Sequence, residues 1–344
     1  MTKDLKKYII LLILALNFQF AKTQDLSAYF NLKDSAELAL VKGDFKLSNQ
    51  KYFNLISKND FVFASDCYNA FQVSLLAKDS LNGFYFISKC FEQGISLNTI
   101  KQSPLIDYYI STNCFDNVFD KYDSLHSNYL QKVNWKLRDR IIKIYEKEQL
   151  YNEKFDHSNV FNFIPNRIIY KKVNKIAIDS LLSIVEEIGF FPGEKEIGII
   201  QPSMYQFDSL TEKYYQAIKG RPYLNTHEYL MFAHYYQFGG RKDLDTFLLR
   251  SLQCFQIKPK DFAFVSDFKK MKKKNEYYSL KRKALKTYNK LKDPIKRELF
   301  IQNINKNRSR IGLYPLEIEK LYKERIQYQR DQYLLNNFKL IYIE

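Results

Sequence analysis

Two segments of the N-terminal half, Gly43 to Ile56 and Lys78 to Phe91, share one pattern at an offset of 35 residues. Small and apolar residues recur in both at spacings of three and four, as one buried helix face requires. The stretch before each segment is also helical in pattern and carries alanines where two helices would touch closely. A helix pair cannot bury its own apolar face, so these pairs must stack on neighbouring helices.

The turn within each pair carries the most specific residues. Gly43 to Phe45, followed by the small residue Ser48, resembles the turn of the tetratricopeptide repeat, a helix-turn-helix unit of about 34 residues. In the second copy Lys78 to Ser80 forms a degenerate turn and Gly83 is the small residue. The resemblance covers about residues 26–95 and implies a helical-repeat array. Because about three repeats are needed for stability, the following helices are expected to dock on these two.

The C-terminal half is predicted to be helical as well, since 10 Gly and 8 Pro are few for a protein with many strands and turns. Its apolar periodicity predicts helices over residues 129–155, up to Gly189, near 205–219, 226–238, 243–255 and 259–273, over 275–292, and from Pro315 to about Asn337. The predicted fold is therefore all-α, with a signal peptide at 1–24, a tetratricopeptide-like array at 25–125 and a C-terminal helical domain at 126–344.

Five short blocks of the C-terminal half support this reading. Their order is similar to that in a family of exported bacterial proteins of unknown function that is common in Bacteroidetes. The blocks are LRDRIIKIYEKEQLYNEK, IVEEIGFFPGEKEIG, HYYQ, IKPKDFAFVSD and NRSRIGLYPLEIEKLY, within about residues 130–325. The resemblance implies a helical domain and brings no activity with it.

The N-terminus predicts export. A lysine-rich start precedes an apolar run over residues 8–16, which is shorter than the roughly 20 residues needed to cross a bilayer. This pattern is typical of a cleaved secretory signal. We therefore expect a periplasmic or extracellular protein that is not an integral membrane protein.

The net charge of +16 and pI near 9.3 can attract nucleic acid, anionic lipid or acidic polysaccharide, although basic residues spread over a whole protein are usually solvated surface. The densest basic stretch, residues 269–297, holds 13 Lys or Arg against two acids, with interleaved tyrosines. Its candidate anion-binding residues are Lys272, Lys273, Lys274, Lys281 and Arg282. Alternatively, these cations are the solvated face of a helix that buries Tyr277, Ala284 and Tyr288. An exported protein seldom meets nucleic acid, so no specific nucleic-acid partner is expected.

Of the four histidines, His234 is the candidate catalytic residue. With a neighbouring carboxylate it would act as a general acid or base near neutral pH. Possible partners after folding are Glu148, Glu187, Asp261 and Asp267. Alternatively, His234 is a core histidine bonded to a backbone carbonyl or a tyrosine hydroxyl. His227 lies seven residues before it, too far along a helix to share one metal ion, so no metal site is predicted.

Arg308 and Arg310 are candidate binding residues, because guanidinium groups grip carboxylate or phosphate with two parallel hydrogen bonds. A structural ion pair of these arginines with Glu148 or Asp267 explains them equally well. No nucleophile elbow, Walker loop or dinucleotide-binding glycine pattern is present, and no cofactor is expected.

The chain has four cysteines, and the even number permits disulfides in an oxidising compartment, although buried free thiols are the favoured reading. The cysteines are Cys67, Cys90, Cys114 and Cys254.

The leading functional hypothesis is an exported, non-catalytic scaffold or adaptor that binds a protein or peptide on a concave helical-repeat surface. One alternative is a hydrolase-like enzyme centred on His234. Another is a binder of anionic envelope components through residues 269–297.

Overall fold

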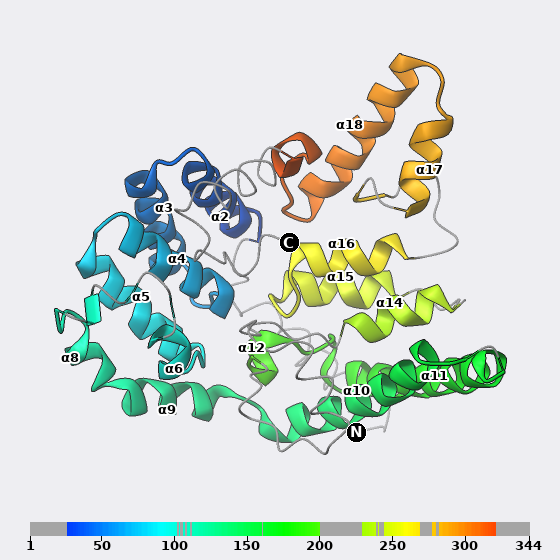
Figure 1. Cartoon of the computed structure of the whole chain (residues 1–344), viewed down its shortest axis with the longest axis horizontal. Coiled ribbons are helices and arrows are strands. Elements are labelled where there is room, and N and C mark those ends of the chain that lie inside the picture. Colours follow the sequence, from blue (N-terminus) through cyan, green and yellow to red (C-terminus); the bar gives the residue numbers. More distant parts are fainter. Residues whose placement is uncertain are drawn as a thin grey trace, which may run out of the picture.

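The computed structural model confirms the all-α prediction, since every element formed by the residues it describes is a helix. Figure 1 shows the helices following one another around a curved body, from the N-terminal pairs through a long hairpin to the C-terminal helices. No helix in the described part of the chain is long and apolar enough to cross a membrane. The structure describes residues 26–101, 103, 106, 109–110, 112–159, 161–199, 229–238, 240, 244–268, 277–279 and 282–320. The predicted signal peptide and the helix predicted near 205–219 lie outside these residues, as does the last predicted helix beyond Lys320.

The N-terminal array consists of two helix pairs, in which each helix packs on the next along the chain. The first pair is α2 (Leu26–Val41) and α3 (Phe45–Lys58), and the second is α4 (Ala64–Leu76) and α5 (Ser80–Glu92). Both turns contain a residue with positive φ, Gly43 at 81° and Lys78 at 56°. In both, the next residue is an aspartate whose side chain accepts the backbone N–H three positions later. These matching caps explain why the two segments align in sequence.

The small residue of each pair marks a close approach between helices. The Ser48 hydroxyl donates to the Ala36 carbonyl at 2.8 Å, across the first pair. At the equivalent position, a Cβ on Gly83 would lie 3.0 Å from the Phe115 ring and 3.2 Å from the Ser74 hydroxyl. Both positions therefore favour a small residue.

Three further helices close the array, α6 (Leu97–Lys101), α8 (Asp116–Phe119) and α9 (Tyr122–Lys132). Both α8 and α9 pack on α5. Every residue of α4 from Ala64 to Leu75 is buried, including the polar Asp66, Asn69 and Gln72. This helix therefore offers no accessible surface.

The long helix predicted over 129–155 is two helices. Helix α9 ends at Lys132, Val133 is extended, and α10 (Trp135–Asp156) begins after Asn134, whose side chain accepts from the Leu137 backbone N–H at 3.1 Å. Trp135, the first residue of α10, is 39% exposed. Helix α10 forms an antiparallel hairpin with α11 (Phe163–Ile188), which ends as predicted at Gly189 with φ 89°.

The centre of the C-terminal half is built from the short helix α12 (Glu194–Ile197) and from α14 (Leu230–Gln237), α15 (Asp245–Gln253) and α16 (Pro259–Asp267). These helices and the α10–α11 hairpin share one apolar core around Ile141, Leu181, Met231 and Leu248. Helices α14, α15 and α16 were predicted from periodicity and turn residues, and they are confirmed with ends shifted by a few residues. Pro259 occupies the first turn of α16, where its missing N–H costs no hydrogen bond.

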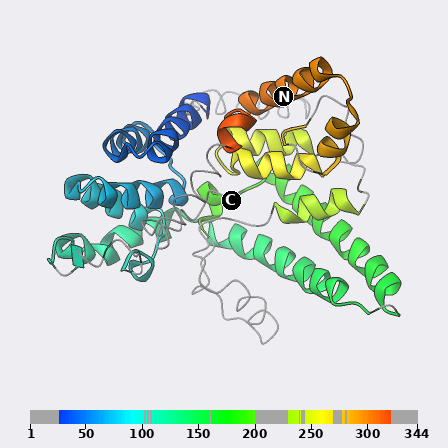
Figure 2. The same ribbon diagram turned by 45° about the horizontal axis from the view of Figure 1, so that its top comes forward.

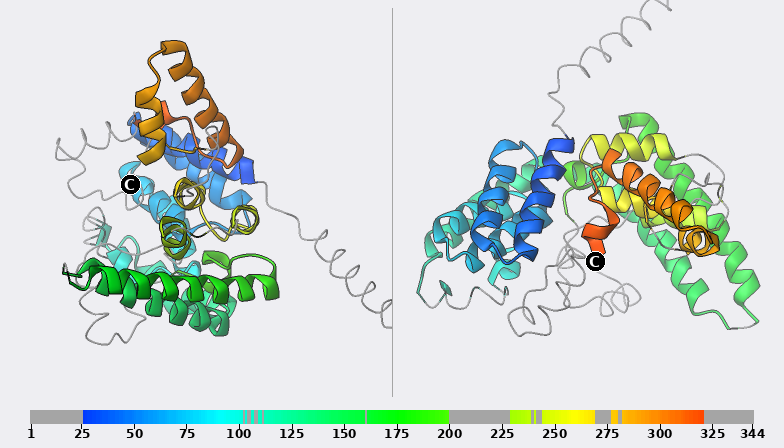
Figure 3. Two further views of the ribbon diagram at one scale, coloured as in Figure 1. Left: turned by 90° about the vertical axis from the view of Figure 1, so that its right-hand side faces the viewer. Right: turned by 90° about the horizontal axis from the view of Figure 1, so that it is seen from above.

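Two more helices, α17 (Arg282–Lys290) and α18 (Pro294–Arg310), project from this core at one end of the molecule (Figure 3). The basic helix predicted over 275–292 is shorter, because residues 277–279 are not helical. Tyr277 and Ala284 are buried against Phe300 and Ile304 of α18, whereas Leu285 is 44% exposed. Helix α18 was not predicted.

Aromatic and charged contacts join the two halves. Tyr29 and Phe30 of α2 pack on Phe255, with ring centroids 5.2 and 6.3 Å apart. Lys258 donates to the Ser65 hydroxyl at 2.7 Å. Figure 2 shows the array beside α12 and α16, while the α10–α11 hairpin extends away from it.

Candidate functional site

The buried carboxylate of Glu148, on α10, is the centre of the most polar cluster in the C-terminal core. One of its oxygens accepts the Tyr170 hydroxyl at 2.5 Å, the Asn174 amide at 2.9 Å and His234 Nδ1 at 2.9 Å. The other accepts the Gln149 amide at 2.7 Å. Asn174 also donates to the Met231 carbonyl of α14. The carboxylate thus joins α10, α11 and α14. Hydrogen bonds to a charged acceptor are stronger than those between neutral groups.

The contact with Glu148 orients His234. Since a carboxylate accepts from Nδ1, the proton of the neutral ring lies on Nδ1 and Nε2 keeps its lone pair. The Glu148 side chain is fully buried, and that of His234 is 19% exposed. Burial, with the nearby Glu148 charge second, raises the pKa of Tyr170 far above its usual range. Tyr170 therefore stays a hydrogen-bond donor at physiological pH.

Aromatic side chains pack around the Glu148–His234 pair. The Tyr170 ring lies edge-on to His234 at 5.9 Å and to Phe238 at 5.0 Å, and it stacks on Phe155 at 5.8 Å. The arrangement provides an oriented base beside an apolar surface. Within the described part of the chain, the His234 side chain hydrogen bonds only to Glu148, so no hydroxyl or thiol nucleophile is paired with it.

Of the four carboxylates named from the sequence, Glu148 is the one that reaches His234. Asp267 accepts from the Tyr278 backbone N–H and the Ser279 hydroxyl, and Glu187 pairs with Arg140 on the surface. Asp261 is half-buried near Lys258 instead, and desolvation raises its pKa. His227 lies outside the described residues.

Arg308 is buried and its guanidinium is used inside the fold. It donates to the Tyr314 carbonyl at 2.7 Å and the Tyr278 carbonyl at 2.8 Å, and it pairs with Glu319 at 2.7 Å. Its ionic partner is therefore Glu319, whereas Glu148 or Asp267 was expected. These bonds hold the end of α18 against the following turn, which leaves little of Arg308 for an external ligand.

The structure brings none of the other basic candidates together into a binding site within the described residues. Arg310 is exposed at the end of α18. Lys272, Lys273, Lys274 and Lys281 lie outside the described residues, and for Arg282, at the start of α17, only the backbone is described.

A surface pocket on the array was missed by the sequence reading. It lies between α5 and α8 and has a volume of about 330 Å³. Leu81, on its rim, is 81% exposed, and Phe53 of the neighbouring α3 packs on Tyr85 while staying 38% exposed. In the sequence, the pocket was indicated by Leu81, an apolar residue on the side of α5 opposite its buried residues. The residues that line the pocket are Leu81, Phe84, Tyr85, Ser88, Asn117, Val118 and Lys121.

A buried ionic cluster sits where the two halves meet. Asp66, fully buried, accepts the Tyr29 hydroxyl at 2.7 Å and pairs with Lys33 at 2.9 Å. Glu194 of α12 accepts the backbone N–H of Ala64 and lies 3.9 Å from Lys258. Burial raises the pKa of Glu194 to about 7, with Lys258 opposing the shift. The cluster joins α2 and α4 to α12 and α16, a structural role.

The four cysteines are all free thiols. Burial raises the pKa of both Cys67 and Cys90 well above the usual thiol value. Protonated, buried thiols are poor nucleophiles, so these two act as small apolar side chains.

Within the residues that the structure describes, no cluster of three or more His, Cys, Asp or Glu side chains could hold a metal ion. No protein-family model, curated protein or solved structure matches the chain. The function must therefore be argued from the molecule's own surfaces.

Proposed function

We propose that the protein is an exported, non-catalytic interaction protein that binds a partner protein or peptide on the outer face of its helical array. The pocket between α5 and α8 is the observation that carries this proposal, because its rim exposes Leu81 almost completely. Large exposed apolar groups beside a pocket are typical of protein interaction sites. Export rests on the sequence alone, on residues 1–24.

The outer face supports this proposal better than the concave face does. A concave binding surface needs accessible first helices in each repeat, and α4 is buried from Ala64 to Leu75. The accessible apolar groups belong instead to the second helices, Phe53 of α3 with Leu81 and Tyr85 of α5. Phe84 and Val118 also line the pocket, so the fitting partner segment is an apolar anchor.

A photo-crosslinker placed at the pocket rim tests this proposal. With Leu81→p-benzoylphenylalanine, irradiation in the native cell envelope should yield one dominant covalent adduct. The matched control is the same residue at Leu299 on α18, which is 52% exposed, and it should give no such adduct. Equal adducts at both positions, or adducts at Leu299 alone, would contradict the proposal.

A second candidate function is acid–base catalysis by His234. It is favoured by one observation, the 2.9 Å contact of Nδ1 with the buried Glu148 and the partial exposure of the ring. This is the base-and-orienter arrangement used in many hydrolytic sites.

The variant His234→Ala separates catalysis from packing. Glu148 keeps its bonds from Tyr170, Asn174 and Gln149, so the melting temperature should change little. If His234 is a general base, hydrolysis of a responsive ester or amide substrate should fall by about 100-fold or more. A melting temperature several degrees lower, with hydrolysis unchanged, would assign His234 to packing alone.

A further inference from the structure

The outer face of α11 carries two parallel rows of exposed side chains. Positions four residues apart lie on one face of a helix. One row is mainly apolar and consists of Ile164, Ile168, Lys172 and Ile176, in which the three isoleucines are 67%, 52% and 58% exposed. The adjacent row is cationic and consists of Arg167, Lys171 and Lys175, all exposed. We call these seven residues the α11 outer face.

The charge of this region has one sign. Between Asp156 and Asp179 the sequence contains no acidic residue, while it contains four Lys or Arg. None of these four cations forms an ion pair with a described carboxylate. Among the described residues their charges are therefore available to an anionic partner.

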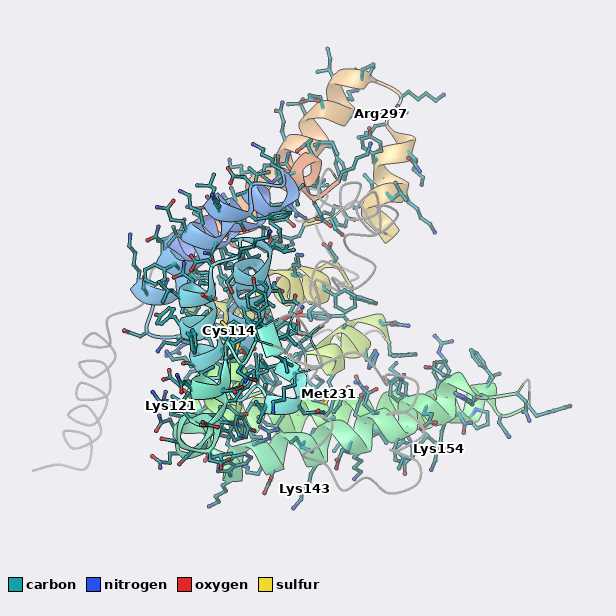
Figure 4. The ribbon with its side chains drawn as sticks, turned by 60° about the vertical axis from the view of Figure 1, so that its left-hand side comes forward. Cys114, Lys121, Lys143, Lys154, Met231 and Arg297 are labelled. Atoms are coloured by element: carbon teal, nitrogen blue, oxygen red, sulfur yellow. The ribbon has the colours of Figure 1, made fainter. Side chains whose placement is uncertain are left out.

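The α11 outer face points away from the rest of the molecule. On the opposite side of α11, Tyr170 and Asn174 are buried on Glu148, and Asn174 bonds to Met231 of α14. Figure 4 shows Lys143 and Lys154 of α10 on the side of the hairpin away from Met231. Both lysines are exposed, so they add positive charge to that side. Phe161, at the tip of the hairpin, is 89% exposed.

We propose that the α10–α11 hairpin docks on the surface of a membrane rich in anionic lipid, through the α11 outer face and Phe161. Isoleucine and phenylalanine side chains would enter the boundary between headgroups and acyl chains, while the cations contact lipid phosphates. Lysine stems lie along apolar surface and keep their charge at the headgroups. A lipid surface fits scattered apolar groups without a shaped pocket, which favours it over a folded protein as the occupant. This surface lies apart from the array pocket and from α17.

Vesicle co-sedimentation of the full-length chain tests this proposal. Vesicles of phosphatidylcholine with phosphatidylglycerol should bind the protein, and pure phosphatidylcholine vesicles should bind it at least tenfold more weakly. Each cation near an anionic surface strengthens binding about fivefold. Charge reversal by K171E/K172E/K175E should therefore weaken binding at least tenfold, and raising the salt to 0.5 M should weaken the wild type similarly. The apolar variant I164S/I168S should also bind more weakly.

Matched controls place the effect on α11. The reversal K286E/K290E/K292E changes three exposed lysines of the α17 region, and I295S/L299S removes two exposed apolar groups of α18. Both variants should bind as the wild type does. Unchanged binding of K171E/K172E/K175E would overturn the proposal and would assign binding to another segment, such as the apolar residues 8–16. Equal loss in the α17 control, or no vesicle binding by the wild type, would overturn it as well.

Discussion

Replacing Gly193 by alanine should destabilise the protein by about 3 kcal/mol, at the upper end of what overpacking a core costs. A Cβ at this position would lie 1.8 Å from the backbone carbonyl oxygen of Gln256, so backbone has to move. The Gly193 N–H donates to the Gln256 side chain at 2.8 Å, and that bond would be displaced. For a chain of 344 residues the melting temperature should fall by roughly 4 °C in differential scanning calorimetry.

Gly43→Ala is the matched control. Gly43 has φ 81°, which alanine adopts only with strain, but no atom lies within 4 Å of the position of its Cβ. This variant should cost about 1 kcal/mol from backbone strain alone. If Gly193→Ala proves no more destabilising than Gly43→Ala, Gly193 does not pack against the Gln256 backbone as closely as the structure has it.

Removing the Glu148 carboxylate should have the other large effect. In Glu148→Ala the donors of Tyr170, Asn174 and His234 lose a common acceptor in the core. Removing the common acceptor of a buried charged network leaves its donors unpaired and costs about 4 kcal/mol in unfolding free energy. Urea unfolding followed by circular dichroism measures this change.

Glu187→Ala provides the comparison on the surface of the same hairpin. Glu187 pairs with Arg140 at 3.0 Å, and both side chains are largely exposed. An exposed pair contributes less than about 1 kcal/mol, so this variant should unfold nearly as the wild type does. Similar losses for the two glutamate variants would mean that Glu148 is not buried among its donors.

The helices of the array were predictable because turn and capping residues close in sequence fix where each helix begins or ends. Gly43 and the two capping aspartates, Asp44 and Asp79, fix turns whatever the rest of the chain does. The same holds for Gly189, which ends α11 with positive φ, and for Pro259, which starts α16. Local backbone chemistry decided each of these boundaries.

One helix, α18, and one helix break, at Asn134, were missed for physical reasons. Helix α18 has only a sparse apolar pattern, with Phe300 and Ile304 as its buried apolar residues, so its periodicity was too weak to detect. The overlooked start signal was Asp293, which caps the helix just before a proline. The break at Asn134 was missed because the apolar pattern continues across it and only the asparagine cap marks the new helix.

The candidate site was predictable only in part. The sequence singled out His234, but its partner Glu148 lies 86 residues away, and four carboxylates were equally possible until the chain folded. Arg308, near the end of α18, pairs with Glu319 eleven residues later, across the turn that follows the helix, a contact that spacing does not reveal. Long-range pairing of this kind depends on packing, which periodicity does not encode.

We propose that the array binds its partner on the face formed by α3, α5 and α8. The most direct measurement is the affinity of the partner crosslinked at position 81 for three variants of the full-length chain, by biolayer interferometry. L81E/Y85E should weaken binding at least tenfold, whereas I295E/L299E on α18 and His234→Ala should bind as the wild type does. Wild-type affinity in L81E/Y85E would contradict the claim.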